Sequence, residues 1–93
     1  MNKNTVTKEQ IDAIMGSTVY EDRKIGAKTT VVCATLPNGF EITESAACVD
    51  PANYDHAVGV KICLERIANR VWQLEGYRLQ DKLAEDAAKA GGW

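Results

Sequence analysis

The chain has 93 residues, enough for a single domain spanning 1–93, with frayed ends expected at 1–6 and 90–93. Its formal charge of −2 and pI near 5.3 argue against binding to a DNA or RNA polymer, which requires a basic surface. No apolar run approaches the ~20 residues of a membrane span, and the polar residues 1–10 lack a signal-peptide core, so the sequence predicts a cytoplasmic protein. A domain of this size buries only about 60% of its unfolded surface, so its concentrated apolar segments favour association with copies of itself.

The first predicted element is a short helix that begins after Thr7. Thr7 is a good N-cap, Gln10 stands at the capping-box position, and Gly16 is suited to end the helix in a left-handed conformation. The helix carries one narrow apolar stripe, which consists of Ile11, Ile14 and Met15. We therefore expect about three turns of helix with a single apolar side.

One β-hairpin is predicted in the middle of the chain. Residues 17–28 have mixed charges and no steady period, so we interpret them as an ordered connector, with an extended stretch as an open alternative. Residues 29–36 are apolar and β-branched, which favours a strand. The turn is predicted as type I at Pro37-Asn38 with Gly39 left-handed, because proline cannot occupy the first position of a primed turn. The return strand, 40–45, alternates polar and apolar residues, so one face of the hairpin is expected to contact solvent.

A long helix is predicted for the rest of the chain. Asp50 is suited to cap a first turn at Pro51, and the helical pattern begins near Tyr54. Its apolar residues spread over more than one stripe: Val58, Val60, Ile62, Cys63, Leu64, Ile67, Ala68, Val71, Trp72 and Leu74. A helix that is apolar on most sides is buried on most sides, so neighbouring subunits are expected to cover it. Gly76 is expected to kink the helix. The predicted fold is therefore α+β: a short N-terminal helix, one β-hairpin and a long, kinked C-terminal helix that takes part in oligomerisation.

The residues offer little support for catalysis. The one histidine, His56, is interpreted as a surface or capping residue, and the chain has no nucleophile elbow, P-loop or dinucleotide fingerprint. The cysteines, Cys33, Cys48 and Cys63, have no second cysteine or histidine two to four residues away, so we expect buried thiols and no metal site. The sequence predicts a binding protein without a metal or cofactor, and not an enzyme.

Two clusters are candidate ligand sites. The first combines an aromatic ring for stacking, cations for phosphate and hydroxyl groups: Tyr20, Arg23, Lys24, Lys28, Thr29 and Thr30. Its alternative interpretation is a solvated loop in which Glu21 and Asp22 cancel the positive charge. The second lies on the long helix and comprises Arg66, Asn69 and Arg70. Copies of this helix around a symmetry axis would form a ring of cations suited to an anion; the alternative is a polar helix face with intrahelical salt bridges.

Residues 28–79 contain an ordered series of motifs: Thr29-Thr30-Val31-Val32-Cys33, Leu36-Pro37-Asn38-Gly39-Phe40, Ser45-Ala46-Ala47-Cys48-Val49-Asp50-Pro51-Ala52-Asn53-Tyr54-Asp55, Gly59, and Val71-Trp72-Gln73-Leu74-Glu75-Gly76-Tyr77. The series covers over half of the chain and resembles a family of short bacteriophage proteins. That family includes the phage anti-CBASS proteins, or sponges, which sequester cyclic oligonucleotide signals. Two positions depart from its pattern: Gln73 stands where proline is frequent, and Glu44 stands where glycine is common.

The resemblance implies a helix–hairpin–helix protein that assembles as a compact homohexamer in the host cytoplasm. It further implies binding of cyclic dinucleotides such as cGAMP between protomers, and of cyclic trinucleotides in separate pockets near three-fold axes. Binding without cleavage lowers the free messenger, blocks activation of the CBASS effector and so gives immune evasion. By the same resemblance, Lys28 contacts phosphate, Tyr20 stacks on a base, and Arg70 or Arg66 serves the trinucleotide pocket.

Two other functions stay open at this stage. One is an oligomeric protein-binding inhibitor of a host enzyme, which would use the solvated face of the hairpin and Trp93. The other is a small hydrolase of the same nucleotide signals. Replacing Lys28 or Tyr20 by alanine would abolish binding in a sponge and leave a protein inhibitor unaffected, whereas a hydrolase would release linearised nucleotide.

Overall fold

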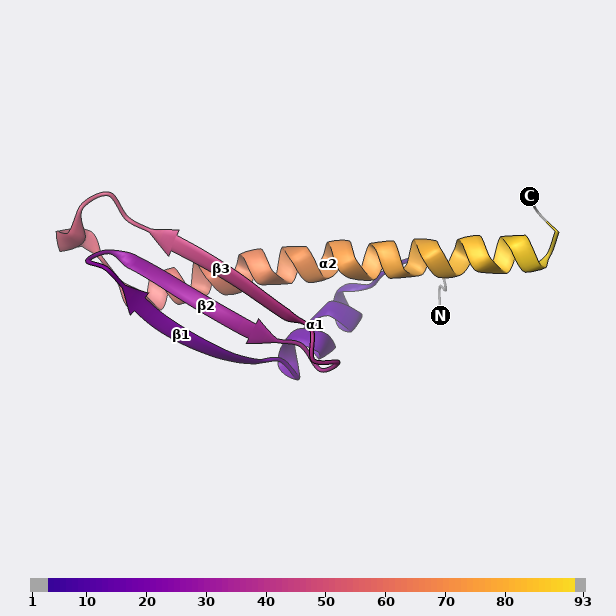
Figure 1. The fold of residues 1–93 in the computed structure, drawn as a ribbon, viewed down its shortest axis with the longest axis horizontal. Helices are drawn as coiled ribbons and strands as arrows, with labels where there is room; N and C mark the ends of the chain where they lie inside the picture. The colour runs from indigo at the N-terminus through magenta and orange to yellow at the C-terminus, as the bar shows by residue number, and fades with distance from the viewer. Residues whose placement is uncertain (1–3, 92–93) are drawn as a thin grey trace.

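The computed structural model describes residues 4–91, which form an α+β fold with one sheet and two helices. In chain order the elements are α1 (Lys8–Gly16), β1 (Val19–Ile25), β2 (Thr29–Thr35), β3 (Glu41–Ala47), the 3₁₀ turn η1 (Pro51–Asn53) and α2 (His56–Lys89). The strands form an antiparallel sheet in the order β1-β2-β3. Helix α2 runs along one face of the sheet and continues well beyond it (Figure 1), which gives the chain dimensions of 61 × 23 × 21 Å. The predicted α+β class is confirmed.

The sheet has three strands, so the prediction of a single hairpin is wrong, and residues 17–28 contain the extended stretch that was the open alternative to an irregular connector. Strand β1 occupies most of that segment and pairs with β2 over seven residue pairs, from Val19 opposite Thr35 to Ile25 opposite Thr29. Nearly all of its side chains are exposed, because β1 is an edge strand that only partly overlaps the helix. Its sequence therefore carries no apolar alternation from which a strand can be predicted. Gly26, with φ of 71°, makes the tight turn between β1 and β2.

The start of α1 is as predicted, but its end is not. Thr7 Oγ1 accepts a hydrogen bond from the Gln10 backbone N–H at 3.2 Å, and Gln10 Oε1 accepts one from the Thr7 N–H at 2.8 Å. These two bonds confirm the capping box. Gly16 does not adopt the predicted left-handed conformation; it is the last helical residue, and the C-cap Ser17 has φ of −101°. The Thr18 hydroxyl instead donates to the carbonyl of Ile14 at 2.7 Å, which satisfies one of the last carbonyls of the helix.

The turn between β2 and β3 is confirmed as predicted. The Gly39 N–H donates to the carbonyl of Leu36 at 2.8 Å, which closes a four-residue turn around Pro37-Asn38. Gly39 has φ of 92°, the left-handed conformation expected for it. The Leu36 N–H donates back to Phe40 at 2.8 Å and sets the register of the return strand. Within β3, Ile42 is buried and its neighbours are exposed, so the alternation was predicted correctly.

The turn η1 before helix α2 is capped by Asp50 as predicted, but α2 is not kinked. Asp50 caps η1 by accepting from the Ala52 N–H at 2.9 Å, and Asp55 caps α2 by accepting from the Val58 N–H at 3.3 Å. The helix then runs for 34 residues without a break at Gly76, so the predicted kink is wrong (Figure 1). An interior glycine costs about 1 kcal/mol relative to alanine, which weakens a helix without bending it.

The core lies between α2 and the helix-facing side of the sheet. Cys63, Ile67 and Val71 of α2 are fully buried and pack with buried residues from the other elements: Ile11, Val32, Ala34, Leu36 and Ile42. Cys33 and Cys48 are only half-buried, so the expectation of buried thiols holds for Cys63 alone. Val6, which was expected in a frayed end, packs against this core. Trp93 lies outside the described residues.

Several large apolar side chains remain exposed on the single chain. On α2 they are Val58, Trp72, Leu74 and Tyr77, of which Tyr77 is 75% exposed. No described element covers the opposite side of the sheet, where Val19 and Ile25 are 68% and 56% exposed. Large exposed apolar side chains, where they gather into a patch, are a usual mark of an interaction surface. They agree with association between copies, which stays a prediction.

Candidate functional site

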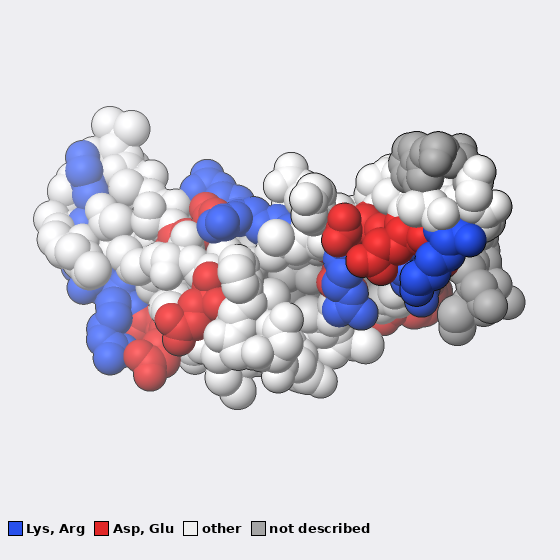
Figure 2. Space-filling model, turned by 45° about the vertical axis from the view of Figure 1, so that its right-hand side comes forward, with Lys and Arg blue, Asp and Glu red and all other residues white. Residues whose placement is uncertain are grey.

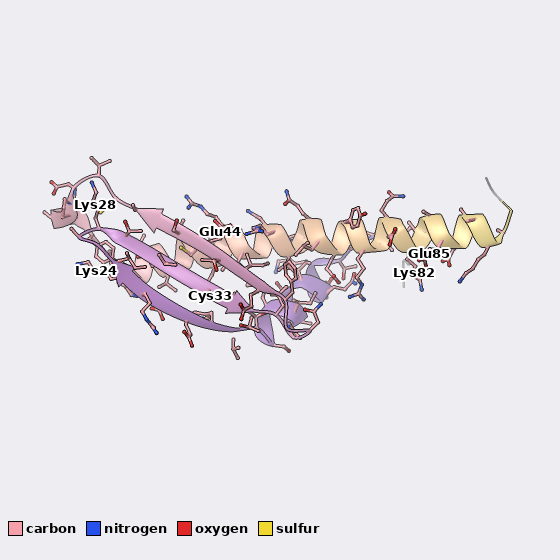
Figure 3. All side chains as sticks on the ribbon, in the orientation of Figure 1. Lys24, Lys28, Cys33, Glu44, Lys82 and Glu85 are labelled. Atoms are coloured by element: carbon pink, nitrogen blue, oxygen red, sulfur yellow. The ribbon has the colours of Figure 1, made fainter. Side chains whose placement is uncertain are left out.

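The candidate site lies where the β1–β2 turn, the end of β3, η1 and the start of α2 meet. A cavity of about 100 Å³ opens there. Among the residues that line it are Lys28, Thr30, Cys48, Tyr54, Asp55 and Gly59. Thr30 is fully buried, whereas Lys28 and Tyr54 are half-buried and Asp55 is exposed, so these three belong to its accessible wall. Figure 3 shows Lys24 and Lys28 at this same end of the sheet.

Lys28 is held in the cavity wall by bonds to the segment that follows β3. Its ammonium Nζ donates to the backbone carbonyl of Val49 at 2.7 Å. Its own carbonyl accepts from the Cys48 N–H at 3.2 Å, which ties the turn to this segment. An ammonium has three N–H donors. Lys28 is therefore positioned with donors left over for an anionic ligand.

Four polar side chains form a continuous hydrogen-bonded chain beside the cavity. The hydroxyls of Thr30 and Tyr54 lie 2.7 Å apart, and the Tyr54 hydroxyl lies 2.6 Å from His56 Nδ1. His56 Nε2 lies 2.6 Å from Asp22 Oδ2 on β1. The Lys24 ammonium lies 4.8 Å from the centre of the Tyr54 ring, in a cation–π geometry. The tyrosine is thus held through its hydroxyl and contacted on its ring.

His56 is not the free surface residue or cap that the sequence suggested, but a member of this hydrogen-bonded chain of side chains. Asp55, not His56, caps α2, and His56 bonds to a residue 34 positions earlier in the sequence. Its partner Asp22 belongs to β1, which the sequence did not identify as a strand. Without that strand, no local pattern indicates that Asp22 and His56 meet.

The first predicted cluster is divided between the two sides of the sheet. Lys24 lies opposite the buried Thr30 and so belongs to the side that faces α2. Arg23 lies opposite Val31 on the other side, and its guanidinium lies 3.7 Å from the carboxylate of Glu21. Thr29 lies on that same outer side, opposite Ile25. Of the predicted cluster, only Lys28 and Thr30 line the cavity, and Lys24 contacts the ring of Tyr54.

Tyr20 lies at the other end of β1 from this cavity. It pairs with Ala34, four positions from Lys24, which corresponds to about 13 Å along a strand. It lines a separate hollow with residues of the outer face, including Glu21 and Cys33. Within one chain, the aromatic ring beside Lys28 is therefore that of Tyr54. A shared site for Tyr20 and Lys28 would need two chains.

The second predicted cluster bridges α2 to β3. Arg66 donates to the carbonyl of Ser45 at 2.7 Å, and Arg70 Nη1 lies 3.4 Å from Glu44 Oε2. The two arginines therefore both reach toward β3. Their observed partners lie on β3, whereas the alternative interpretation expected partners on their own helix. Asn69 is exposed on α2 between them.

The surface charges are mixed. On the face shown in Figure 2, Lys and Arg side chains lie next to Asp and Glu side chains both at the sheet end and along distal α2. Within residues 4–91, no group of three or more His, Cys, Asp or Glu side chains is arranged to hold a metal ion. Among the described helices, none has the length and hydropathy needed to span a membrane.

Comparison with models of protein families identifies a match to a phage family. The model of the phage protein (N4 Gp49/phage Sf6 gene 66) family matches residues 6–83, which include every strand, α1 and most of α2. No curated protein and no solved structure gives a significant match to the chain.

Proposed function

The chain belongs to the phage protein (N4 Gp49/phage Sf6 gene 66) family, and we propose that it is an anti-CBASS sponge. In this proposal a homo-oligomer in the host cytoplasm binds cyclic oligonucleotide messengers and withholds them from the CBASS effector without cleaving them. The observation that carries the proposal is the cavity at the sheet end, where a positioned ammonium and an aromatic side chain adjoin a helix N-terminus.

The electrostatics of this cavity suit one phosphate group. The Lys28 ammonium supplies charge-assisted donors, and the N-terminal end of α2 adds the positive end of a 34-residue helix dipole. The Asp55 carboxylate also lines the cavity and opposes an anion. It is already engaged with the Val58 N–H, so part of its charge is compensated at the cap.

The size of the cavity requires a second copy of the chain for a whole nucleotide ligand. Sites for drug-sized ligands usually enclose about 300–1,000 Å³, whereas this cavity has about 100 Å³. One chain therefore supplies only part of the site in this proposal. We assign a second aromatic to the exposed Tyr20 of another copy, because Tyr20 and Lys28 lie at opposite ends of the sheet within one chain.

The affinity that sequestration needs is within reach of such a shared site. A cyclic dinucleotide has about 45 heavy atoms, and ~0.3 kcal/mol per atom gives roughly −13 kcal/mol, a nanomolar complex. A rigid, closed ligand clamped between two subunits loses little conformational entropy on binding. Cyclic trinucleotides are assigned to a second pocket near Arg66, Asn69 and Arg70, in which copies of α2 would converge.

Calorimetric titration with a panel of cyclic di- and trinucleotides tests the proposal. We expect nanomolar binding of at least one dinucleotide, and loss of that binding in Lys28→Ala. Lys82→Ala is the matched control, because Lys82 is an exposed lysine on distal α2 (Figure 3). If no nucleotide of the panel gives a heat of binding, the sponge proposal is wrong. If Lys28→Ala and Lys82→Ala bind the nucleotide equally well, Lys28 is not part of the binding site.

An oligomeric inhibitor of a host enzyme is the second candidate function. The observation that favours it is the outer side of the sheet, where Val19 and Ile25 are exposed next to the half-buried Val31 and Cys33. Co-purification with a host enzyme, unaffected by Lys28→Ala, would support this candidate over the sponge.

A further inference from the structure

We propose that Asp22 and His56 are positioning residues that hold Tyr54 in the wall of the Lys28 cavity with its hydroxyl proton directed away from a ligand. The chain of hydrogen bonds from Asp22 through His56 and Tyr54 to Thr30 carries this inference. Its consequence for ligand binding rests on the proposed function, whereas the arrangement of protons in the chain does not.

The carboxylate at one end of the chain determines the direction of every proton in it. An ionised Asp22 only accepts hydrogen bonds, so His56 Nε2, at 2.6 Å, must be the donor. In the neutral imidazole the other nitrogen, Nδ1, is then an acceptor, and the Tyr54 hydroxyl must donate to it. The Tyr54 oxygen is left to accept from the Thr30 hydroxyl. The protons therefore run in one order, from Thr30 to Tyr54 to His56 to Asp22.

Burial and packing make Thr30 a fixed end of this chain. Thr30 is 0% exposed, so its hydroxyl has no water to contact, and it lies against Gly59 of α2. A buried hydroxyl without a partner is costly, and the bond to Tyr54 satisfies it. No described buried side-chain nitrogen or oxygen lacks a partner. The tyrosine is thus tied to β2 on one side and, through His56, to β1 on the other.

The direction of the Tyr54 hydroxyl proton determines which part of a nucleotide can bind next to Tyr54. The single proton of the Tyr54 hydroxyl is used on His56, so the tyrosine offers a ligand only its ring and an oxygen lone pair. A phosphate oxygen needs donors and is therefore disfavoured there, while the Lys28 ammonium supplies them. We expect a base or a ribose hydroxyl against Tyr54 and the phosphate against Lys28.

Asp22 and His56 support this wall from outside the cavity. Neither is among the residues that line it, and their side chains are 40% and 39% exposed. Truncating Asp22 therefore removes a bond to His56 at the surface without emptying the core or touching the ligand. Glu21, the preceding residue of β1, has the same charge on the opposite side of the sheet and provides a matched control.

Nitrogen NMR of the imidazole tests the proton order without any ligand. His56 is the only histidine, so a histidine-labelled protein gives one pair of ring nitrogen signals. At a pH where the ring is neutral, we expect the Nε2–H tautomer, a shift toward a mixed population in Asp22→Ala, and no change in Glu21→Ala. An Nδ1–H tautomer in the unchanged protein, or a tautomer insensitive to Asp22→Ala, would overturn the proposal.

Titration with a cyclic dinucleotide tests the consequence for binding. Asp22→Ala is expected to weaken binding about tenfold, the effect of one displaced hydrogen-bonded group. Asp22→Asn, which keeps an oxygen acceptor for His56, should recover most of the affinity, and Glu21→Ala should match the unchanged protein. If the unchanged protein binds and Asp22→Ala binds equally well, the positioning role is wrong. If no nucleotide binds, the sponge fails, and the tautomer measurement alone decides the positioning role.

Discussion

Gly59 of α2 lies directly against Thr30 of β2, and no larger residue fits between the helix and the sheet at this point. A Cβ atom added at Gly59 would lie 2.7 Å from Thr30 Cβ, a separation that real Cβ atoms essentially never show. Thr30 cannot move aside easily, because it is fully buried and its hydroxyl is bonded to Tyr54. This contact sets how closely the start of α2 approaches the sheet, and hence the width of the Lys28 cavity.

Replacing Gly59 by alanine is therefore expected to destabilise the fold. Overpacking of this kind costs about 1–3 kcal/mol, and urea denaturation measures it. Gly76→Ala is the matched control within the same helix, because nothing lies within 4 Å of a Cβ at Gly76. The control should raise stability by about 0.5–1 kcal/mol through helix propensity. A Gly59→Ala protein as stable as the Gly76→Ala protein would show that helix and sheet are not in this close contact.

The capping box at α1 gives a second prediction. Thr7→Ala removes the acceptor of the Gln10 N–H and should lower the free energy of unfolding by about 1 kcal/mol. Ser17→Ala, at the other end of the same helix, is expected to change stability by less than half as much. Denaturation curves of both variants against the unchanged protein make the comparison. Equal curves for all three proteins would contradict the observed cap.

The features that were predictable from the sequence are those with a local chemical signature. The cap at Thr7, the turn closed by Gly39 and the cap at Asp50 each depend on residues within three or four positions, and all three are confirmed. Strand β1 was missed because an exposed edge strand has no apolar face to produce alternation. The uninterrupted path of α2 past Gly76 was missed because a lone glycine weakens a helix without breaking it.

The candidate site was predictable only in part, for a related reason. Lys28 and Thr30 follow the Gly26 turn closely in sequence, and they do lie together at the cavity. Tyr54, His56 and Asp22 join them only through the pairing of β1 with β2 and the packing of α2 on the sheet. The residues that make those contacts are far apart in the sequence, and no local pattern of residue types predicts that they meet.

The thiol of Cys63 is expected to resist modification in the folded protein. Burial raises its pKa, with a further increase from Glu44 and a partial offset from Arg66. Because the unfolded thiol ionises at lower pH than the folded one, the unfolded state gains stability as the pH rises above about 8.5. The stability that depends on the protonated thiol is present below that pH and is lost above it.

Alkylation at about pH 8 followed by mass spectrometry tests this expectation. Cys48, which is half-buried and lines the cavity, serves as the internal reference. Cys63 should remain unmodified while Cys48 reacts, and both should react in urea. Equal rates at the two cysteines under native conditions would contradict the burial of Cys63.

Glu44 is expected to limit binding at the proposed trinucleotide pocket. Its carboxylate lies 3.4 Å from Arg70, so a ligand phosphate would have to compete with it for the guanidinium. Glu44→Ala should therefore raise the affinity for a cyclic trinucleotide several-fold, whereas Glu41→Ala, on the same strand and pointing to the other side, should not. Competition binding measures both variants. A weaker complex in Glu44→Ala would show that Glu44 supports the ligand instead of opposing it.

A sponge sequesters its ligand without cleaving it, and recovery of the ligand after binding distinguishes this from hydrolysis. A cyclic dinucleotide is incubated with an excess of the protein, and the concentration of free nucleotide is measured. The protein is then denatured by heat, and the released nucleotide is identified by mass spectrometry. For a sponge, we expect free nucleotide to disappear on mixing and to return intact and in full on heating. Nucleotide that never leaves solution, or that returns linearised, would contradict this expectation.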